Sequence, residues 1–336
     1  MESAPVPDLV DDPDLDRLLT SFDTHYAWNY GSVKEGLRDL YEKAKREQWN
    51  GTTELDWSQA VDPQSEIVPE AFNPLQDYRP FRRLDARERS RFRHASLAWQ
   101  LSQFLHGEQG ALITASQLVA AVPWIDAKHY AATQTMDEAR HVEVFSRYVS
   151  EKLEWEFPID ANLKSLLDII LLDERWDFKY LGMQVLVEGL AMAAFANLYQ
   201  LVQEPLLKHL IHAVMRDESR HVAFGVLSLR GYYDDMPVAE RRDREDFVIE
   251  ASRLMRDRLV GDAVADVMGF DRAEVRALIL ESPIMQAFRQ GLFARVVPNI
   301  KRLGLLTPRV SEAYAEMGVL QFADLDPEAA DHALGL

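Results

Sequence analysis

One motif, Asp-Glu-x-Arg-His, occurs twice in this chain, at 137–141 and again at 217–221. A lone glutamate inside an apolar stretch, Glu108 or Glu188, precedes each motif. The interval from Glu108 to Glu138 is the same as the interval from Glu188 to Glu218, so the lone glutamates and the motifs repeat in register. Features that repeat in register predict two helical hairpins related by an approximate two-fold axis.

The spacing within the motif suits the binding of a metal ion. A Glu and a His three residues apart project from the same face of a helix and can bind one ion together. The lone glutamates lie among apolar residues, which bury them against the facing motif. Four carboxylates in one core are strongly unfavourable without positive charge, and two divalent cations balance them. The predicted ligands of this two-metal site are Glu108, Glu138, His141, Glu188, Glu218 and His221.

The residues beside the ligands predict how the histidines are held. We expect Asp217 to accept a hydrogen bond from His141 of the other hairpin, which fixes the imidazole tautomer. By the same symmetry, Asp137 accepts one from His221. The neighbouring arginines neutralise these aspartates, so the predicted support of the ligands is Asp137, Arg140, Asp217 and Arg220. The alternative is a metal-free bundle with buried salt bridges, which the missing positive charge makes costly.

The hydropathy pattern predicts a mostly helical protein. The chain of 336 residues has only 15 Gly and 15 Pro, and long segments carry apolar residues at spacings of three and four. Pro123 and Pro205 lie where helices turn back on each other. The predicted fold is all-α, a four-helix bundle with additional N- and C-terminal helices. The long helices span approximately 88–121, 125–154, 173–203 and 206–232, with a shorter piece at 160–172.

The same pattern divides the chain into three parts. Residues 1–84 form an N-terminal arm and wrapping segment, residues 85–233 the di-metal bundle, and residues 234–336 a helical extension packed on the bundle. The features expected outside the bundle are a disordered stretch at 1–16, a helix at 33–49, an extended segment at 50–84 and a helix at 238–265.

Charge and composition exclude several classes of function. Lys and Arg number 37 against 55 Asp and Glu, and the net charge of −18 argues against nucleic acid or an anionic membrane as a partner. The absence of cysteine excludes disulfides, thiolate metal sites and iron–sulfur clusters within the chain. The N-terminus lacks a secretory signal, and we expect no membrane span and a cytoplasmic location. Oxygen and imidazole ligands suit iron or manganese, whereas zinc prefers a smaller tetrahedral set.

Four stretches, 101–108, 136–141, 185–188 and 216–221, resemble the di-iron centre of ferritin-like oxygenases. The likeness covers roughly residues 95–230 and is greatest to the hydroxylase large subunit of bacterial multicomponent monooxygenases. The chain is also similar to acyl carrier protein desaturases, to the small subunit of ribonucleotide reductase and to arylamine N-oxygenases. The resemblance implies a ferritin-like bundle and two iron ions, or manganese and iron, that activate dioxygen.

The resemblance implies a non-haem di-iron oxygenase, a monooxygenase-type oxidoreductase without catalytic residues beyond the metal ligands. It would hydroxylate or N-oxygenate a small, largely apolar or aromatic molecule. Because the chain lacks cysteine, a separate reductase or ferredoxin would supply electrons. The resemblance also allows a homodimer. The alternatives are a ferroxidase or iron-binding ferritin-like protein, a di-iron desaturase or oxidase, and a non-catalytic protein stabilised by metal.

Three positions depart from the patterns of these families. Met192 stands where the monooxygenase subunits usually have a threonine, which disfavours small hydrocarbons as substrates. Phe145 stands where the reductase subunits usually have a tyrosine, which disfavours a stable tyrosyl radical. Val214 stands where the arylamine N-oxygenases have a seventh, histidine ligand, so N-oxygenation is not supported by one here.

Side chains one turn from the ligands are candidates for a substrate pocket beside the metals. Most are apolar, which fits an apolar substrate and a site that excludes water. Ordinary packing in the bundle core explains any one of them equally well. The candidates are Phe104, Ala111, Leu112, Gln134, Phe145, Gln184, Ala191, Met192, Phe195 and Gly225.

Overall fold

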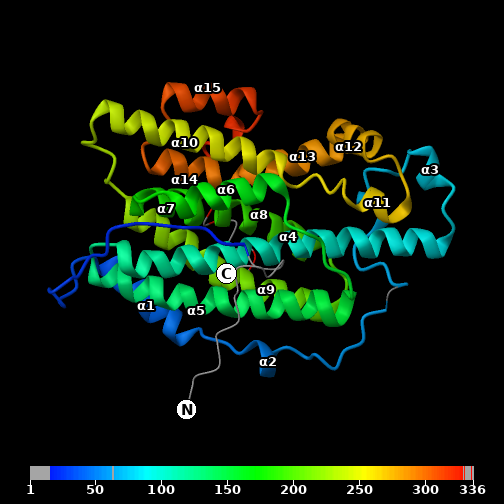
Figure 1. Ribbon diagram of the computed structural model, residues 1–336, viewed down its shortest axis with the longest axis horizontal. Coiled ribbons are helices and arrows are strands. Elements are labelled where there is room, and N and C mark those ends of the chain that lie inside the picture. The colour runs from blue at the N-terminus through cyan, green and yellow to red at the C-terminus, as the bar shows by residue number, and fades with distance from the viewer. Residues whose placement is uncertain (1–15, 63, 328, 330–333, 335–336) are drawn as a thin grey trace, which may run out of the picture.

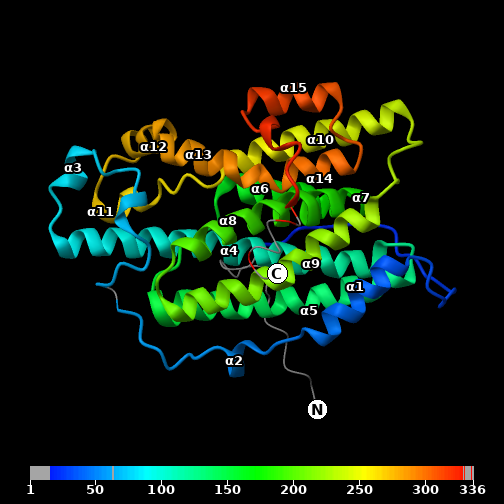
Figure 2. The ribbon, with the colours of Figure 1, turned by 180° about the vertical axis from the view of Figure 1, so that it is seen from behind.

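The computed structural model describes residues 16–62, 64–327, 329 and 334, and all regular structure in this part of the chain is helical. Long helices pack side by side at the centre, and other helices cover them on opposite sides (Figures 1 and 2). The predicted all-α fold is therefore confirmed. The central helices are α4 (Ala86–Ala121), α5 (Ile125–Tyr148), α8 (Glu188–Leu201) and α9 (Pro205–Leu229).

Local sequence determines where the central helices begin. The side chain of Asp85 accepts a hydrogen bond from the backbone N–H of Glu88, and the Glu88 side chain accepts one from the backbone of Asp85, which forms a capping box before α4. Glu204 caps α9, and Pro205 occupies the first helical position, where its missing N–H costs nothing. Helix α4 packs against α5, helix α8 packs against α9, and each motif lies in the second helix of a pair.

The third predicted helix, 173–203, differs from a regular α-helix. It starts later as α7 (Trp176–Lys179), passes through a π-helical stretch (Tyr180–Val187) and then continues as α8. A π-helix bonds each residue one position further along than an α-helix does. This stretch ends immediately before Glu188 and sets the face on which that ligand projects. A shorter π-helical turn, Val149–Leu153, ends the helix predicted at 125–154.

The N-terminal part of the chain covers one side of the bundle. Helix α1 (Glu35–Arg46) packs against α5 and α9 and is slightly shorter than the helix predicted at 33–49. In both views α1 and α2 lie on the side opposite to α10 and α15. The segment 50–84 has little regular structure, as predicted, but its apolar side chains Leu55, Ile67, Leu75 and Phe81 are buried. Its short helices are α2 (Gly51–Glu54), Glu70–Phe72 and α3 (Arg79–Arg82).

The C-terminal part covers the opposite side. Helix α10 (Val238–Asp257) ends earlier than the predicted 238–265, because the chain turns at Gly261. Gly261 has a φ of +76° and lies against the ring of Trp99, so a side chain there would be strained. The remaining helices are α6 (Ala161–Leu172), α11 (Val264–Met268), α12 (Arg272–Glu281), α13 (Pro283–Gly291), Leu292–Ala294, α14 (Val296–Arg302), α15 (Pro308–Glu316) and Leu320–Phe322.

Within the described residues, the continuous helix Trp176–Leu201 is long and apolar enough to cross a membrane by length and composition alone. This finding corrects the expectation that no stretch of the chain has the length and apolar character of a membrane span. The most apolar 18-residue stretch of this helix has a mean hydropathy of 1.4, and 78% of that stretch is buried inside the protein. A central helix covered on all sides has the same composition, so length and composition alone are weak evidence for a membrane span.

Gly225 of α9 lies where α9 approaches the π-helical stretch. A Cβ atom at Gly225 would be 2.6 Å from the Cβ atom of Gln184. We expect Gly225→Ala to lower the free energy of unfolding by about 1–3 kcal/mol, because the two helices must separate. The control is Gly107→Ala in α4, whose added Cβ meets nothing within 4 Å and whose stability should stay equal or rise slightly. Urea unfolding measures both, and equal stability of Gly225→Ala and the wild type would contradict close packing.

Candidate metal centre

The six predicted ligands converge in the interior of the bundle from α4, α5, α8 and α9. Each of the six residues has a relative exposure of 5% or less. Their ligand atoms form two groups, and within each group all the atoms lie within 4.8 Å of one another. The first group is Glu108, Glu138, His141 and Glu218, and the second is Glu138, Glu188 and His221.

The first group surrounds one ring nitrogen. The Nδ1 atom of His141 lies 3.2 Å from a Glu108 oxygen, 3.4 Å from a Glu138 oxygen and 3.1 Å from a Glu218 oxygen. Neighbouring ligands of an octahedral ion are about 3 Å apart when each is about 2.1 Å from the metal. These separations therefore match the ligands of a single ion.

The second group repeats this arrangement around His221. Its Nδ1 atom lies 3.1 Å from Oε1 of Glu138 and 3.6 Å from Oε2 of Glu218. Glu138 and Glu218 thus direct one oxygen toward each histidine, so two bound ions would share these carboxylates. Glu108 and Glu188 each belong to one group and would each serve one ion.

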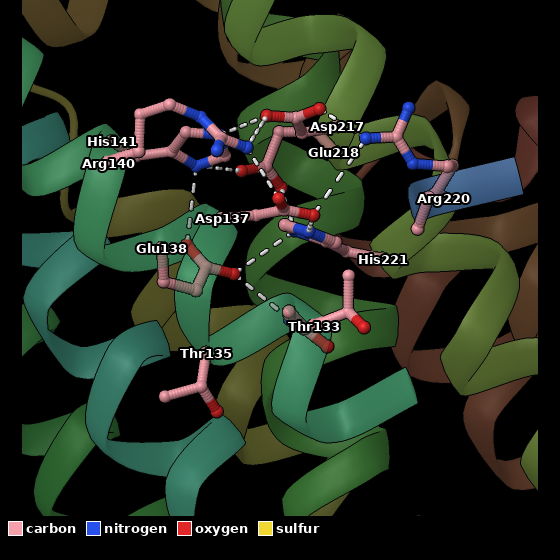
Figure 3. A network of polar contacts seen from close by, with 12 residues as sticks. Thr133, Thr135, Asp137, Glu138, Arg140, His141, Asp217, Glu218, Arg220 and His221 are labelled. Carbon is pink, nitrogen blue, oxygen red and sulfur yellow. Dashed lines mark hydrogen bonds and ion pairs between the residues drawn. The ribbon is translucent and has the colours of Figure 1, made fainter. Parts of the chain in front are cut away.

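The other nitrogen of each imidazole faces an aspartate of the opposite hairpin (Figure 3). Nε2 of His141 lies 3.1 Å from Oδ2 of Asp217, and Nε2 of His221 lies 3.3 Å from Oδ2 of Asp137. This is the crossed pairing that the sequence predicts. An N–H donated to the aspartate places the proton on Nε2 and leaves Nδ1 free to bind a metal.

Two buried arginines hold the aspartates together. Arg140 lies 2.5 Å from Asp137 and 3.0 Å from Asp217, so one guanidinium pairs with both carboxylates. Arg220 forms ion pairs with the same two aspartates. Burial raises the pKa of Asp217. The hydrogen bond and the charge of His141, followed by the charges of the two guanidiniums, outweigh burial and hold this pKa well below its ordinary value.

Burial and close packing change the protonation of the ligands themselves. Burial raises the pKa of Glu108 and of Glu188 well above the ordinary value, and the charge of Glu218 adds to this. Burial lowers the pKa of both histidines, but their carboxylate partners outweigh it, so the pKa of His141 and of His221 is raised. Without a metal the cluster therefore retains protons that bound cations replace.

Several ligand atoms form no hydrogen bond. These atoms bear on whether the six residues fit two metal ions. Among the described residues, both oxygens of Glu218, one oxygen each of Glu138 and Glu188, and Nδ1 of His221 are buried without such a bond. Buried polar atoms are rarely left without a partner in proteins. The donor set, its buried negative charge and these free atoms all fit two bound cations, so the cluster is able to hold two metal ions.

The sequence did not reveal the support that the N-terminal part gives to the site. The indole N–H of Trp49 donates to Asp217 at 2.7 Å, and the Gln48 amide donates to Asp137 at 2.8 Å. Glu47 pairs with Arg220 at 2.8 Å. These three consecutive residues follow α1 and have no counterpart in the repeated hairpins, so neither periodicity nor motif could identify them.

The predicted pocket residues divide into two groups. Phe104, Ala111, Ala191 and Phe195 line a small cavity of about 20 Å³ beside Glu108, Glu188 and Glu218. The other candidates lie outside the lining of this cavity: Leu112, Gln134, Phe145, Gln184, Met192 and Gly225. Two of these have other roles in the structure.

Gln134 donates hydrogen bonds from its amide to Glu138 at 3.0 Å and to Glu188 at 2.8 Å, so it orients two ligands. Gly225 allows the close approach of α9 to Gln184. The remaining wall of the small cavity includes Arg258, which lies beyond the bundle and in a region without any sequence signal for the site.

A larger apolar groove lies next to the small cavity. It has a volume of about 690 Å³, which is within the usual range for sites that bind small molecules. The same three segments, α4, α8 and the chain just after α10, contribute to the walls of both spaces. Apolar residues of the groove include Phe72, Leu97, Trp99, Leu259, Val260 and Phe288.

Comparisons with known proteins give a distant likeness in structure and none in sequence. The chain matches no protein-family model and no curated protein. Among solved structures it is similar to variants of an R2-like ligand-binding oxidase with anaerobically reconstituted Mn/Fe cofactor. One has 17% identity and a TM-score of 0.49 over 83% of this chain and 95% of the other, and a second has 18% and 0.45 over 79% and 94%. At these values the likeness identifies no family, and the resemblance to multicomponent monooxygenases stays a prediction.

Proposed function

We propose that this chain is a non-haem di-iron or manganese–iron oxidoreductase that uses dioxygen to hydroxylate or N-oxygenate a small, largely apolar molecule. The proposal rests on one observation above all, the buried six-ligand cluster in which an aspartate of the opposite hairpin holds each histidine. When bound, two redox-active ions supply the electrons for reducing dioxygen.

The chain itself provides orientation and exclusion of water. Asp137 and Asp217 hold the imidazoles with Nδ1 directed at the carboxylates. The rings of Phe104, Phe145 and Phe195 pack together near the ligands, with centroid separations of 4.6 to 6.1 Å. Packed aromatic rings of this kind exclude water and protect reactive species from side reactions with it.

The two spaces beside the ligands suggest different occupants. The small cavity of about 20 Å³ holds little more than one water-sized molecule, so it suits dioxygen or one end of a substrate. The groove of about 690 Å³ is large enough for the rest of an organic molecule. Because the full sequence contains no cysteine, we propose that a separate reductase or ferredoxin delivers electrons.

Loading metal-free protein with Fe(II) under argon and then admitting oxygen tests the proposal. We expect about two iron ions per chain, consumption of oxygen in proportion to iron, and a transient visible absorption band. Continued growth of a ferric mineral would instead indicate a ferroxidase or storage protein. A metal-loaded protein that consumes no oxygen would contradict an oxidase and indicate a structural role.

A matched control separates the buried site from iron oxidised in solution. Asp168 forms an ion pair with Lys164 on α6, a helix that supplies no ligand, so Asp168→Asn should consume oxygen as the wild type does. Mn(II) added together with Fe(II) distinguishes the two metal compositions, since metal analysis after gel filtration reports the ratio retained.

A further inference from the structure

The two ligand groups of the metal centre are unequal. Among the described residues, the first group has four acidic and histidine side chains, and the second has three, Glu138, Glu188 and His221. Glu218 lies closer to the first group, because its oxygens are 3.1 Å from Nδ1 of His141 and 3.6 Å from Nδ1 of His221. Ions bound by oxygen ligands often have six ligands in an octahedral arrangement. The second group therefore has more places for a further ligand.

Gln134 of α5 is a fully buried amide that contacts this second group. Its Nε2 atom lies 2.8 Å from Oε1 of Glu188 and 3.0 Å from Oε1 of Glu138. The same oxygen of Glu138 lies 3.1 Å from Nδ1 of His221. Neighbouring ligands of an octahedral ion are about 3 Å apart. The end of the Gln134 side chain therefore has the separations from both carboxylates that a ligand of the same ion has.

The amide at this position breaks the repeat of the two hairpins. Gln134 corresponds to Val214 of the second hairpin, and Gln184, which contacts Gln134, corresponds to Phe104 of the first. All four side chains are buried. The corresponding pair is thus apolar in one half of the repeat and polar in the other. Buried amides require polar partners, and the partners of Gln134 are the carboxylates of the smaller ligand group.

A bound ion changes which end of the Gln134 amide suits the carboxylates. Toward carboxylates alone the amide directs its NH₂ group, which donates to both. A cation between them repels this NH₂ group and attracts the amide oxygen. A half-turn of the terminal amide exchanges the two atoms with little movement of the rest of the side chain. Gln184 can follow this turn: in the described part of the chain its own oxygen is buried without a hydrogen bond, and it can accept one from the turned NH₂ group.

We propose that the amide oxygen of Gln134 is a seventh ligand of the centre and binds the ion held by Glu138, Glu188 and His221. A carbonyl oxygen is a hard ligand that suits manganese, as carboxylates do. It carries no net charge, so the four ligand carboxylates stay balanced by two divalent cations. This inference rests on the metal-binding part of the proposed function and is independent of the reaction with dioxygen.

A crystal structure of the protein loaded with Mn(II) under argon tests this inference directly. We expect anomalous scattering to locate two ions, with one atom of the Gln134 amide about 2.1 Å from the ion beside His221. An amide NH₂ group has no lone pair to offer a cation, so this distance identifies the oxygen. An amide that stays more than about 3 Å from both ions and donates to Glu188 overturns the inference.

Two substitutions test the same role in solution, by competition between the protein and a coloured chelator for Mn(II). Gln134→Leu removes both polar atoms of the amide, so it should weaken the binding of one ion by about 10-fold or more and leave the other nearly unchanged. Gln134→Glu places an oxygen where the NH₂ group lies and should bind both ions at least as tightly as the wild type. A role as a hydrogen-bond donor predicts weaker binding, because an ionised carboxylate cannot donate. Unchanged affinities for Gln134→Leu, or weaker binding by Gln134→Glu, overturn the inference.

The matched control changes the preceding residue of α5. Thr133 donates to the backbone carbonyl of His129, so Thr133→Val should bind both ions as the wild type does. Circular dichroism before metal loading shows whether each variant keeps its helices, and the crystal structure of the wild type decides the question even if a variant does not fold. Failure of the oxygen experiment with Gln134 bound to the ion would overturn the proposed function and not this inference. Oxygen consumption with Gln134 away from both ions would do the reverse.

Discussion

Glu138→Ala is expected to reduce the metal content from two ions per chain to one or none and to abolish oxygen consumption. Glu138 belongs to both ligand groups, with one oxygen 3.4 Å from Nδ1 of His141 and the other 3.1 Å from Nδ1 of His221. Its removal therefore takes a ligand from each ion at once. Elemental analysis after Fe(II) loading and gel filtration measures the effect, and an oxygen electrode measures the loss of turnover.

The matched control for this variant lies on the same helix. Glu143 is exposed, and its carboxylate accepts a hydrogen bond from Thr52 at 3.1 Å. Glu143→Ala should keep both metal ions and the wild-type rate. Full metal content in Glu138→Ala would contradict its role as a bridging ligand, whereas loss of metal in Glu143→Ala would indicate a general effect on α5.

The second large effect is expected for Asp217→Asn, which preserves shape and removes charge. Asp217 accepts hydrogen bonds from His141, Trp49 and Arg140, and it pairs with Arg220. The variant leaves Asp137 as the one fully buried carboxylate beside the two guanidiniums, with the part-exposed Glu47 on Arg220, and should lower the free energy of unfolding by about 3–5 kcal/mol. It also removes the acceptor that fixes the His141 tautomer, so metal affinity should fall about 10- to 100-fold.

Urea unfolding of metal-free protein and competition with a coloured chelator measure these two effects separately. Asp168→Asn is again a suitable control, since its exposed pair with Lys164 contributes about 1 kcal/mol or less. If Asp217→Asn retained wild-type stability, the buried aspartates and arginines would not form the strongly coupled network that the distances indicate. Unchanged metal affinity would contradict the orienting role of Asp217.

The ligand cluster could be predicted because helix geometry links sequence spacing to spatial position. A Glu and a His three residues apart share a face in any α-helix. The in-register repeat implies that the second hairpin has the same arrangement as the first, related to it by an approximate two-fold axis. The crossed contacts of Asp137 and Asp217 follow from the same symmetry. The structure places all six ligands and both aspartates in one buried cluster.

The surroundings of the cluster could not be predicted in the same way. Whether a side chain one turn from a ligand faces a cavity or a neighbouring helix depends on the rotation of each helix about its axis. The π-helical stretch Tyr180–Val187 changes this rotation before Glu188, and Gln184 within it packs against Gly225 and away from the cavity lining. Trp49 and Arg258 reach the site from segments outside the repeat, where no pattern indicates their direction.

The division of the ligands between the hairpins determines when the centre can assemble during synthesis of the chain. The first group takes Glu218 from α9, although its other members come from α4 and α5. A nascent chain that has emerged only as far as α5 therefore presents three ligands and cannot complete either group. Capture of both ions must wait until α9 has left the ribosome and docked, so metal incorporation reports the assembly of the two hairpins, which needs none of the helices that follow α9.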